Sequence, residues 1–392
     1  MSNTVFSPIT LNTLHLKNRT IKSATYEGMN EANAPSRQLI DWHCKIAEGE
    51  VAMNTLAYCA VNQAGATFSD QIVMQPDIAP QLKAFTDSIH ALGGKVAAQL
   101  AHCGFFSGGK RRNGKPVSPS RTFNKLGFSS GKLFSKAMSQ DEINQTINDF
   151  ARSASIAKEA GFDAIEIHSG HGYLLSQFLS PAFNKRKDEY GGALENRLRF
   201  PVEVIQAVRK EVGSDFPILV KMNLEDGFKG GLTIKEAIHV ATTFEKTGVD
   251  ALILSGGFTS VNAFYLLRGE VPLKEMIRLE KNWITKIALS LFGPFVISRS
   301  PFKRTFFLEQ AKMIREKVKI PLAYVGGITS LEDMEKVLSE GFDLIALGRP
   351  LVHDASFVRK LRTGSITKTG CTYCNQCVAQ IGHNGVKCVL ND

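Results

Sequence analysis

The chain has 392 residues, 43% of them hydrophobic, and a formal net charge of +10 from 47 Lys and Arg against 37 Asp and Glu. This apolar content is sufficient for a large core and excludes a disordered chain. The positive charge forms no long Lys/Arg run and no patch interleaved with aromatic residues, so we attribute it to a solvated surface and expect no nucleic-acid partner.

Short apolar runs recur along the chain, after a polar stretch at 1–18 that lacks the apolar segment of a signal peptide. Most are apolar on both faces, as strands buried between two layers are. The eight expected strands are Thr20–Ala24, Val51–Ala57, Lys95–Leu100, Asp163–Ile167, Ile218–Met222, Ala251–Leu254, Leu322–Val325 and Leu344–Leu347. The clearest helices between them are Gln81–Leu92, Gln140–Ala160, Leu194–Val212, Thr233–Thr247, Thr305–Val318 and Leu331–Ser339. Eight alternations predict an α/β fold with a closed (β/α)₈ TIM barrel rather than an open doubly wound sheet.

Local signals at the helix ends support this alternation. Ser139, Thr233 and Ser330 stand at expected N-cap positions, each ahead of acidic residues in the first turn. A motif of glycine, a hydrophobic residue and aspartate joins three helices to the next strand, at 161–163, 248–250 and 341–343. We expect each glycine to end its helix in a left-handed conformation.

Two segments fall outside the repeat. We expect one barrel domain at 1–362, with a long insertion at 258–303 after the sixth strand, and then a Cys-rich tail at 363–392. The insertion contains the most apolar segment, Trp283–Ile297, which is flanked by basic residues. Such a segment could lie on a membrane surface, but we expect a buried helix. No run of about 18 uncharged apolar residues is present, so we expect no transmembrane segment.

Candidate catalytic residues follow the fourth strand directly. His168, His171 and Tyr173 leave one strand end together, so all three can face the mouth of a barrel. Two neutral imidazoles can donate hydrogen bonds to a carbonyl or nitro oxygen, and a tyrosine can then deliver a proton. The histidines could instead bind a metal or be structural, but their grouping with a tyrosine favours catalysis.

A candidate phosphate site follows the last two strands. Gly326 and Gly327 come after the seventh strand, and Gly348 and Arg349 after the eighth, where barrels commonly bind phosphate. Exposed backbone N–H groups and a guanidinium suit a dianion, although the glycines could merely shape turns.

Two further polar residues are placed at strand ends, Gln99 on the third strand and Lys221 on the fifth. An amide can pair with the edge of a flavin pyrimidine, and a cation there would stabilise a reduced, anionic flavin. Both side chains could simply reach solvent. A buried lysine without a partner would be unfavourable, however, so we expect Lys221 to contact an anionic or electron-rich group.

Together these motifs resemble the Old Yellow Enzyme family over about residues 5–362. The residues that carry the resemblance are His168–Pro181, Asn184–Gly192, Glu195–Phe200, Lys17–Arg19, Gln99–His102, Val325–Ile328 and Leu347–Pro350. The resemblance implies non-covalent FMN in a (β/α)₈ barrel, NAD(P)H as reductant, and reduction of activated alkenes, quinones or nitro compounds.

The resemblance also implies roles by position. His168 and His171 would hold the electron-withdrawing oxygen of the substrate, and Tyr173 would donate the proton. Its implied cofactor-binding residues are Ser23, Ala24, Thr25, Tyr58, Gln99, Lys221, Gly326, Gly327, Gly348 and Arg349. The chain departs from many members at Lys221, where arginine is common, and at Tyr58, where a small residue often lies near the flavin.

The tail carries four of the seven cysteines, Cys371, Cys374, Cys377 and Cys388. Four thiolates can bind a 4Fe-4S cluster or zinc. The pattern resembles the cluster segment of the 2,4-dienoyl-CoA reductase and trimethylamine dehydrogenase branch, with compressed spacing. An unmetallated remnant of that segment is the third interpretation.

We therefore expect an FMN-dependent NAD(P)H oxidoreductase that transfers hydride to an enone, quinone or similar small molecule. The alternatives are an amine dehydrogenase or demethylase that passes electrons through a tail cluster, a non-catalytic flavin-binding or redox-sensing module, and a metal-dependent lyase using His168 and His171. An odd cysteine count without a signal sequence indicates a reducing compartment, so we expect a cytoplasmic protein, which could be a homo-oligomer.

Overall fold

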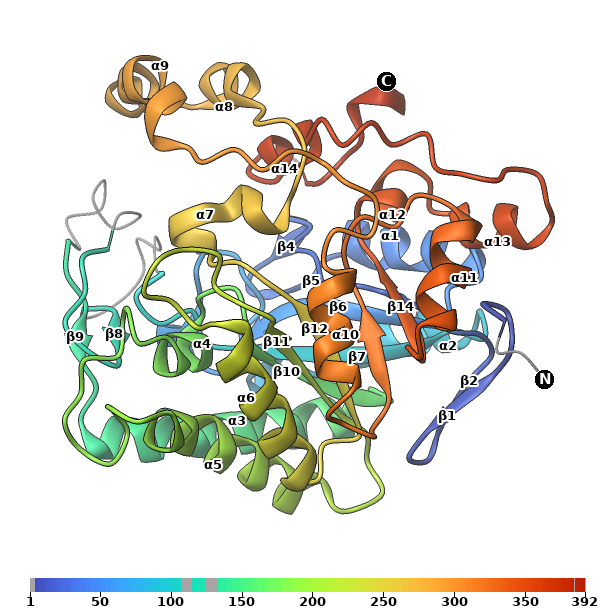
Figure 1. The fold of residues 1–392 in the computed structure, drawn as a ribbon. Helices are drawn as coiled ribbons and strands as arrows, with labels where there is room; N and C mark the ends of the chain where they lie inside the picture. Colours follow the sequence, from blue (N-terminus) through green and yellow to red (C-terminus); the bar gives the residue numbers. More distant parts are fainter. Residues whose placement is uncertain (1–3, 107–114, 125–132, 384, 392) are drawn as a thin grey trace.

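A closed barrel of eight parallel strands forms the centre of the molecule (Figure 1). The computed structural model describes residues 4–106, 115–124, 133–383 and 385–391. Around the barrel, in chain order, the strands are β3 (Thr20–Lys22), β6 (Met53–Ala60), β7 (Lys95–Ala101), β10 (Ala164–Ser169), β11 (Ile218–Asn223), β12 (Ala251–Ser255), β13 (Leu322–Tyr324) and β14 (Leu344–Leu347). The TIM-barrel prediction is confirmed. All eight expected strands are present, and the largest boundary difference is at the end of β6, at Ala60 instead of Ala57.

The core has two parts, inside and outside the barrel wall. Small and branched residues such as Ala97, Ala164 and Leu219 fill the interior, whereas larger side chains pack between the strands and the outer helices. A hairpin of β1 (Ile9–Leu11) and β2 (Leu14–Leu16) adds its leucines to the interior cluster. Because this hairpin packs onto the interior cluster, the opposite, carboxyl end is left for ligands. The remaining short strands are β4 (Asn30–Glu31), β5 (Ala34–Pro35), β8 (Val117–Ser118) and β9 (Lys136–Ala137).

Amphipathic helices cover the outside of the barrel (Figure 1). Ser139 and Thr233 each form a complete capping box, and the Ser330 hydroxyl accepts from the backbone N–H of Asp333, so all three N-cap predictions are confirmed. The helices of the barrel are α1 (Arg37–Glu48), α2 (Ala79–His90), α3 (Gln140–Glu159), α4 (Leu174–Leu179), α5 (Leu194–Val212), α6 (Ile234–Lys246), α10 (Leu308–Arg315), α11 (Leu331–Ser339), α12 (Arg349–His353) and α13 (Phe357–Arg362).

The glycines of the glycine–hydrophobic–aspartate motif have the expected left-handed conformation, and its aspartates have a structural role that was not predicted. Gly161, Gly248 and Gly341 have φ of +88°, +87° and +89°. The carboxylates two residues later accept from the backbone N–H at the start of the preceding strand, at distances of 2.9, 2.7 and 3.0 Å. These three pairs are Asp163 with Val96, Asp250 with Ile218, and Asp343 with Leu322. Each aspartate therefore ties neighbouring strands together at the amino end of the barrel.

The insertion forms α7 (Thr259–Leu266), α8 (Leu273–Leu279) and α9 (Trp283–Val296), beyond the carboxyl ends of the strands (Figure 1). The prediction that Trp283–Ile297 is a buried helix is wrong, because Trp283 is 69% exposed and Phe295 is 87% exposed. Helix α9 packs on α8 along one side only, and α8 itself has no buried residue. Within the described residues, no helix is both long and apolar enough to span a membrane.

Candidate active site

A cavity at the carboxyl end of the barrel brings together most of the expected cofactor residues. Its volume is about 120 Å³, and its lining comes from the ends of β3, β11, β12, β13 and β14 and from the tail. Of the sequence-derived candidates, it contains Ser23, Ala24, Thr25, His171, Lys221, Gly326, Gly327, Gly348 and Arg349. Tyr58 and Gln99 do not line it; they lie beside it on β6 and β7.

One end of the cavity has the character of an anion site. Gly327 has φ +71°, and a Cβ there would lie 2.6 Å from the backbone oxygen of Lys303, so only glycine fits. A Cβ on Gly348 would meet nothing nearer than 3.8 Å, which leaves that backbone open. Arg349 uses Nη1 for all its hydrogen bonds, including 2.7 Å to Asn375 Oδ1, so its Nε and Nη2 have no hydrogen-bond partner among the described residues.

A buried polar triplet lies deeper in the barrel. Lys221 Nζ is 2.6 Å from Glu166 Oε1, and Gln99 Nε2 donates to the same oxygen over 2.5 Å. Lys221 also donates to the Ser23 hydroxyl at 3.4 Å. The ammonium thus has the anionic partner that its burial requires.

The two histidines and the tyrosine lie against one another. The His168 ring centroid is 4.9 Å from that of His171 and 4.7 Å from that of Tyr173, both edge-to-face. Nδ1 of His168 accepts from the backbone N–H of Gly170, so a neutral ring carries its proton on Nε2, where it can be donated. His171 Nε2 lies 2.7 Å from Ser255 Oγ. The structure therefore groups all three candidate catalytic side chains.

Burial fixes their protonation states. Desolvation lowers the pKa of His168 well below its ordinary value, and desolvation, followed by the Lys221 charge, lowers the pKa of His171 to about 3. Burial raises the pKa of the Tyr173 phenol. At neutral pH both imidazoles are uncharged and Tyr173 keeps its proton.

Tyr58 is placed to act on Tyr173. Their rings stack with centroids 5.1 Å apart, and the interaction with the Tyr58 side chain lowers the pKa of Tyr173 against the larger effect of burial. Ala24 packs on the same pair, which connects this aromatic cluster to the cavity. A donor to the phenol oxygen stabilises the phenolate that forms when Tyr173 gives up its proton.

Sequence reasoning missed three residues of the site. Glu166 stands two positions before His168 on β10, so strand alternation could have placed both on one face. Ser255 is the last residue of β12, a position that also could have been noticed. Tyr373 comes from the tail and stacks its ring 4.7 Å from the Arg349 guanidinium carbon, a contact with no local signal.

The four tail cysteines lie near one another, because Cys374 and Cys388 both act on the pKa of Cys371 and of Cys377, and the four-thiolate site stays a prediction. All are free thiols, and the described residues contain no group of three or more His, Cys, Asp or Glu side chains that could hold a metal ion. Burial raises the pKa of Cys371, and that of Cys377 to about 11, so both are protonated thiols at neutral pH when no metal is bound. The Cys388 sulfur lies 3.4 Å from His353 Nδ1.

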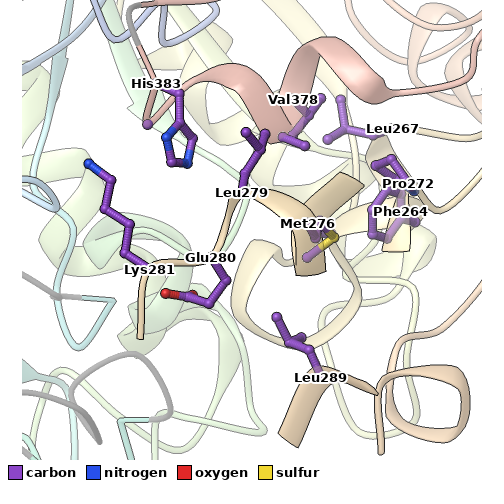
Figure 2. Close-up of a pocket in the computed structure, with 13 residues that line it drawn as sticks. Phe264, Leu267, Pro272, Met276, Leu279, Glu280, Lys281, Leu289, Val378 and His383 are labelled. Atoms are coloured by element: carbon purple, nitrogen blue, oxygen red, sulfur yellow. The ribbon is translucent and has the colours of Figure 1, made fainter. Parts of the chain in front are cut away.

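A larger cavity of about 500 Å³ lies between the insertion and α14 (Gln376–Gln380) (Figure 2). Leu279, Leu289 and Val378 point into it, with His383 and Lys281 at its edge. None of the candidate catalytic or cofactor residues lines this cavity, so we assign the active site to the smaller one at the strand ends.

Comparison with known proteins adds to this geometry. A model of the NADH:flavin oxidoreductase / NADH oxidase family matches residues 4–262. The chain is 37% identical over 391 residues to the 4,4'-dithiodibutanoate disulfide reductase of Rhodococcus erythropolis, covering 99% of this chain and 95% of that protein. It is 30% identical over 365 residues to the NADPH dehydrogenase of Bacillus subtilis (strain 168), covering 92% of this chain and 94% of that protein.

Among solved structures, a 2-naphthoyl-CoA reductase complex matches with a TM-score of 0.83 at 23% identity. The match covers 100% of this chain and 57% of that one, and at this identity it shows the fold alone.

Proposed function

Since the chain belongs to the NADH:flavin oxidoreductase / NADH oxidase family and is a flavin oxidoreductase of the Old Yellow Enzyme type, we propose that it reduces an activated carbon–carbon double bond at the carboxyl end of its barrel. Family membership implies FMN as cofactor and a nicotinamide as reductant. The acceptor is the part of this proposal that the residues of the site must support.

The cavity residues fit FMN. The lining carries Lys221 and Arg349 but no carboxylate among the described residues, and the free N–H groups of Arg349 suit a phosphate. An ammonium at Lys221 would stabilise negative charge on a flavin pyrimidine. The cavity, at about 120 Å³, is smaller than the roughly 300–1,000 Å³ of most small-molecule sites, so side chains of its lining have to move as FMN binds. When bound there, FMN would supply the hydride.

The remaining residues orient and protonate the acceptor. The Nε2–H of His168 and the imidazole of His171 would bind its carbonyl oxygen and withdraw electrons from the conjugated double bond. Tyr173, protonated and beside His168, would give its proton to the α-carbon. The Tyr58 hydroxyl, which lowers the pKa of Tyr173, would stabilise the resulting phenolate.

The observation that carries this proposal is the contact of the His168 ring with both His171 and Tyr173. This contact supports a role for the two neutral imidazoles in binding one oxygen beside a proton donor, which is what reduction of an enone needs.

Tyr173→Phe tests this assignment. Reduction of 2-cyclohexenone should fall by about 10²–10⁴-fold, since general acid catalysis contributes about that much. Anaerobic reduction of the bound flavin by NADPH, which needs no proton from Tyr173, should keep its rate in stopped-flow measurements. Equal losses in both half-reactions would contradict the role given to Tyr173.

A disulfide is a second candidate acceptor, favoured by the similarity to the Rhodococcus disulfide reductase over nearly the whole chain. The two acceptors differ in their need for Tyr173. An α-carbon must be protonated by a positioned acid, whereas a departing thiolate can take its proton from water. Comparing kcat/KM of Tyr173→Phe with cyclohexenone and with 4,4'-dithiodibutanoate therefore separates them, because only the alkene reaction should be slowed.

The alternative of a metal-dependent lyase loses support, because His168 and His171 have no third metal-binding partner among the described residues. All seven cysteines are free, which supports a reducing, cytoplasmic location.

A further inference from the structure

Helix α9 presents a large apolar surface to solvent. Six of its hydrophobic side chains are at least half exposed, and Phe295, at 87%, is the most exposed of them. These six are Trp283, Ile284, Ile287, Leu291, Phe292 and Phe295, which we call the α9 face. Exposed apolar patches of this kind are rare on folded proteins and mark interaction surfaces.

The packing of α9 shows that this exposure is a property of one side of the helix. Thr285, Leu289 and Gly293 recur every four residues and form the row that packs inward. Leu289 points into the cavity beside α8 (Figure 2), and a Cβ on Gly293 would lie 2.8 Å from Leu273 Cδ1, so the two helices touch closely. At about 100° per residue, the α9 face covers roughly half of the helix circumference and is centred opposite that row.

Basic side chains surround the α9 face. Between 274 and 304 there are seven Lys and Arg residues and two Glu, a net charge of +5. Lys281 and Arg299 lie beyond the two ends of the helix and Lys286 lies within it, and none of the three forms an ion pair with a described residue. The α9 face therefore has the charge that complements an anionic surface.

The length of α9 and its basic surroundings distinguish between two possible partners of the α9 face, a lipid surface and a second copy of this chain. A helix of 14 residues is about 21 Å long, too short to cross a hydrocarbon core of about 30 Å but sufficient to lie within its interface. Pairing with a second copy through the same face would bring two basic borders together. We propose that the α9 face docks this protein onto the surface of an anionic lipid bilayer, with Lys281, Lys286 and Arg299 against the headgroups.

Flotation of the full-length holoenzyme with vesicles tests the proposal. The wild type should float with vesicles of phosphatidylcholine and phosphatidylglycerol and bind pure phosphatidylcholine less, because each basic residue near an anionic surface contributes about fivefold. Leu291→Asp/Phe295→Asp should lose more than about tenfold of this binding. Met313→Asp on α10, at a 39% exposed apolar position, is the matched control and should float like the wild type. Flavin absorbance and NADPH turnover show that each variant is folded.

Two further measurements make the outcome decisive. The chain has two tryptophans, so Trp42→Phe leaves Trp283 as the only reporter, and its emission should shift to the blue and be quenched by brominated lipid. Lys281→Glu/Lys286→Glu/Arg299→Glu should weaken binding to anionic vesicles without loss of flavin. Wild-type protein that stays with the buffer, or unchanged binding by the Asp variant, overturns the proposal. A lipid-free dimer that Leu291→Asp/Phe295→Asp dissociates would overturn it in favour of a second copy.

Discussion

At the scale of single residues, the site depends on side chains held in uncommon states by burial. His171 combines a lowered pKa with a backbone φ of +57°, which is uncommon for residues other than glycine, although His, Asn and Asp adopt it more often than most. The backbone N–H of His171 donates to Asn223 Oδ1, which holds the residue in this conformation. The imidazole is thus aimed at the cavity and kept neutral by its surroundings.

This neutral imidazole makes stability depend on pH. The unfolded chain binds a proton at His171 below about pH 6.5, whereas the folded ring stays neutral to about pH 3. The unfolding free energy should therefore fall as the pH is lowered from 6.5, by at most about 1.4 kcal/mol per pH unit for this group, since exposure to the cavity weakens the effect. His171→Asn, which tolerates the same φ, should flatten the slope in urea unfolding between pH 7 and pH 4.5. An unchanged slope would mean that the ring protonates freely in the folded state.

The candidate catalytic residues were the part of the site that was easiest to predict from the sequence. His168, His171 and Tyr173 are close in sequence, so one strand end carries all three together. The partners of Lys221 could not be read in the same way, because Glu166 and Gln99 reach it only through the register between β7, β10 and β11.

At the scale of elements, the barrel owes its regular amino end to the repeated aspartates. Asp250 accepts from the backbone N–H of Ile218 and pairs with Arg209 on α5, so one side chain joins two strands and a helix. Asp343 and Arg315 form the same arrangement at the next pair of strands, β13 and β14. The glycine of the motif was predicted from local conformation, but this connecting role is visible only in three dimensions.

Asp250→Ala should therefore destabilise the fold. Leaving a buried backbone N–H and Arg209 without their partner should lower the unfolding free energy by about 1–3 kcal/mol in urea titration. Asp41→Ala, which removes an exposed i,i+4 pair with Arg37 on α1, is the matched control and should change it by about 0.5 kcal/mol or less. Similar changes in the unfolding free energy for both variants would show that the aspartate of this motif does not stabilise the fold.

The strands and helix caps were predictable because their sequence signals are local. The exposure of α9 was not predictable, because it depends on which other elements pack against the helix. The apolar content of Trp283–Val296 correctly indicated a helix, but hydrophobicity does not show which element covers it. Within the part of the chain that the structure describes, the Thr285–Leu289–Gly293 side is covered, and α8 is the element with extensive contact to α9.

At the scale of the whole molecule, the cofactor cavity is assembled from segments nearly as far apart as the chain allows. Ser23 follows the first barrel strand, Arg349 follows the last, and Tyr373 and Asn375 come from the tail. Asn375 donates to the backbone oxygens of Leu267 and Glu270 while accepting from Arg349. The tail therefore fixes the insertion and Arg349, the proposed phosphate-binding residue, relative to each other.

The substitution Asn375→Ala should weaken the binding of FMN. Arg349 would lose its side-chain acceptor, and FMN affinity should fall by about 5–30-fold, corresponding to about 1–2 kcal/mol. The fluorescence of released FMN on dilution measures this. Asn391→Ala, which removes a tail amide bonded to the backbone oxygen of His353, is the control and should retain the flavin. If Asn375→Ala bound FMN as tightly as the wild type, the tail would have no role in cofactor binding.

The contacts of Tyr373 and Asn375 also set an order of events during synthesis. Translation proceeds from the amino end, so a nascent chain whose eighth strand has just emerged already has its histidines, its Lys221 and its glycines, but still lacks the ring that lies over Arg349. A ribosome-bound barrel of that length would take up flavin and release it quickly. Lasting retention would begin only when Tyr373 and Asn375 have left the ribosome and packed against Arg349.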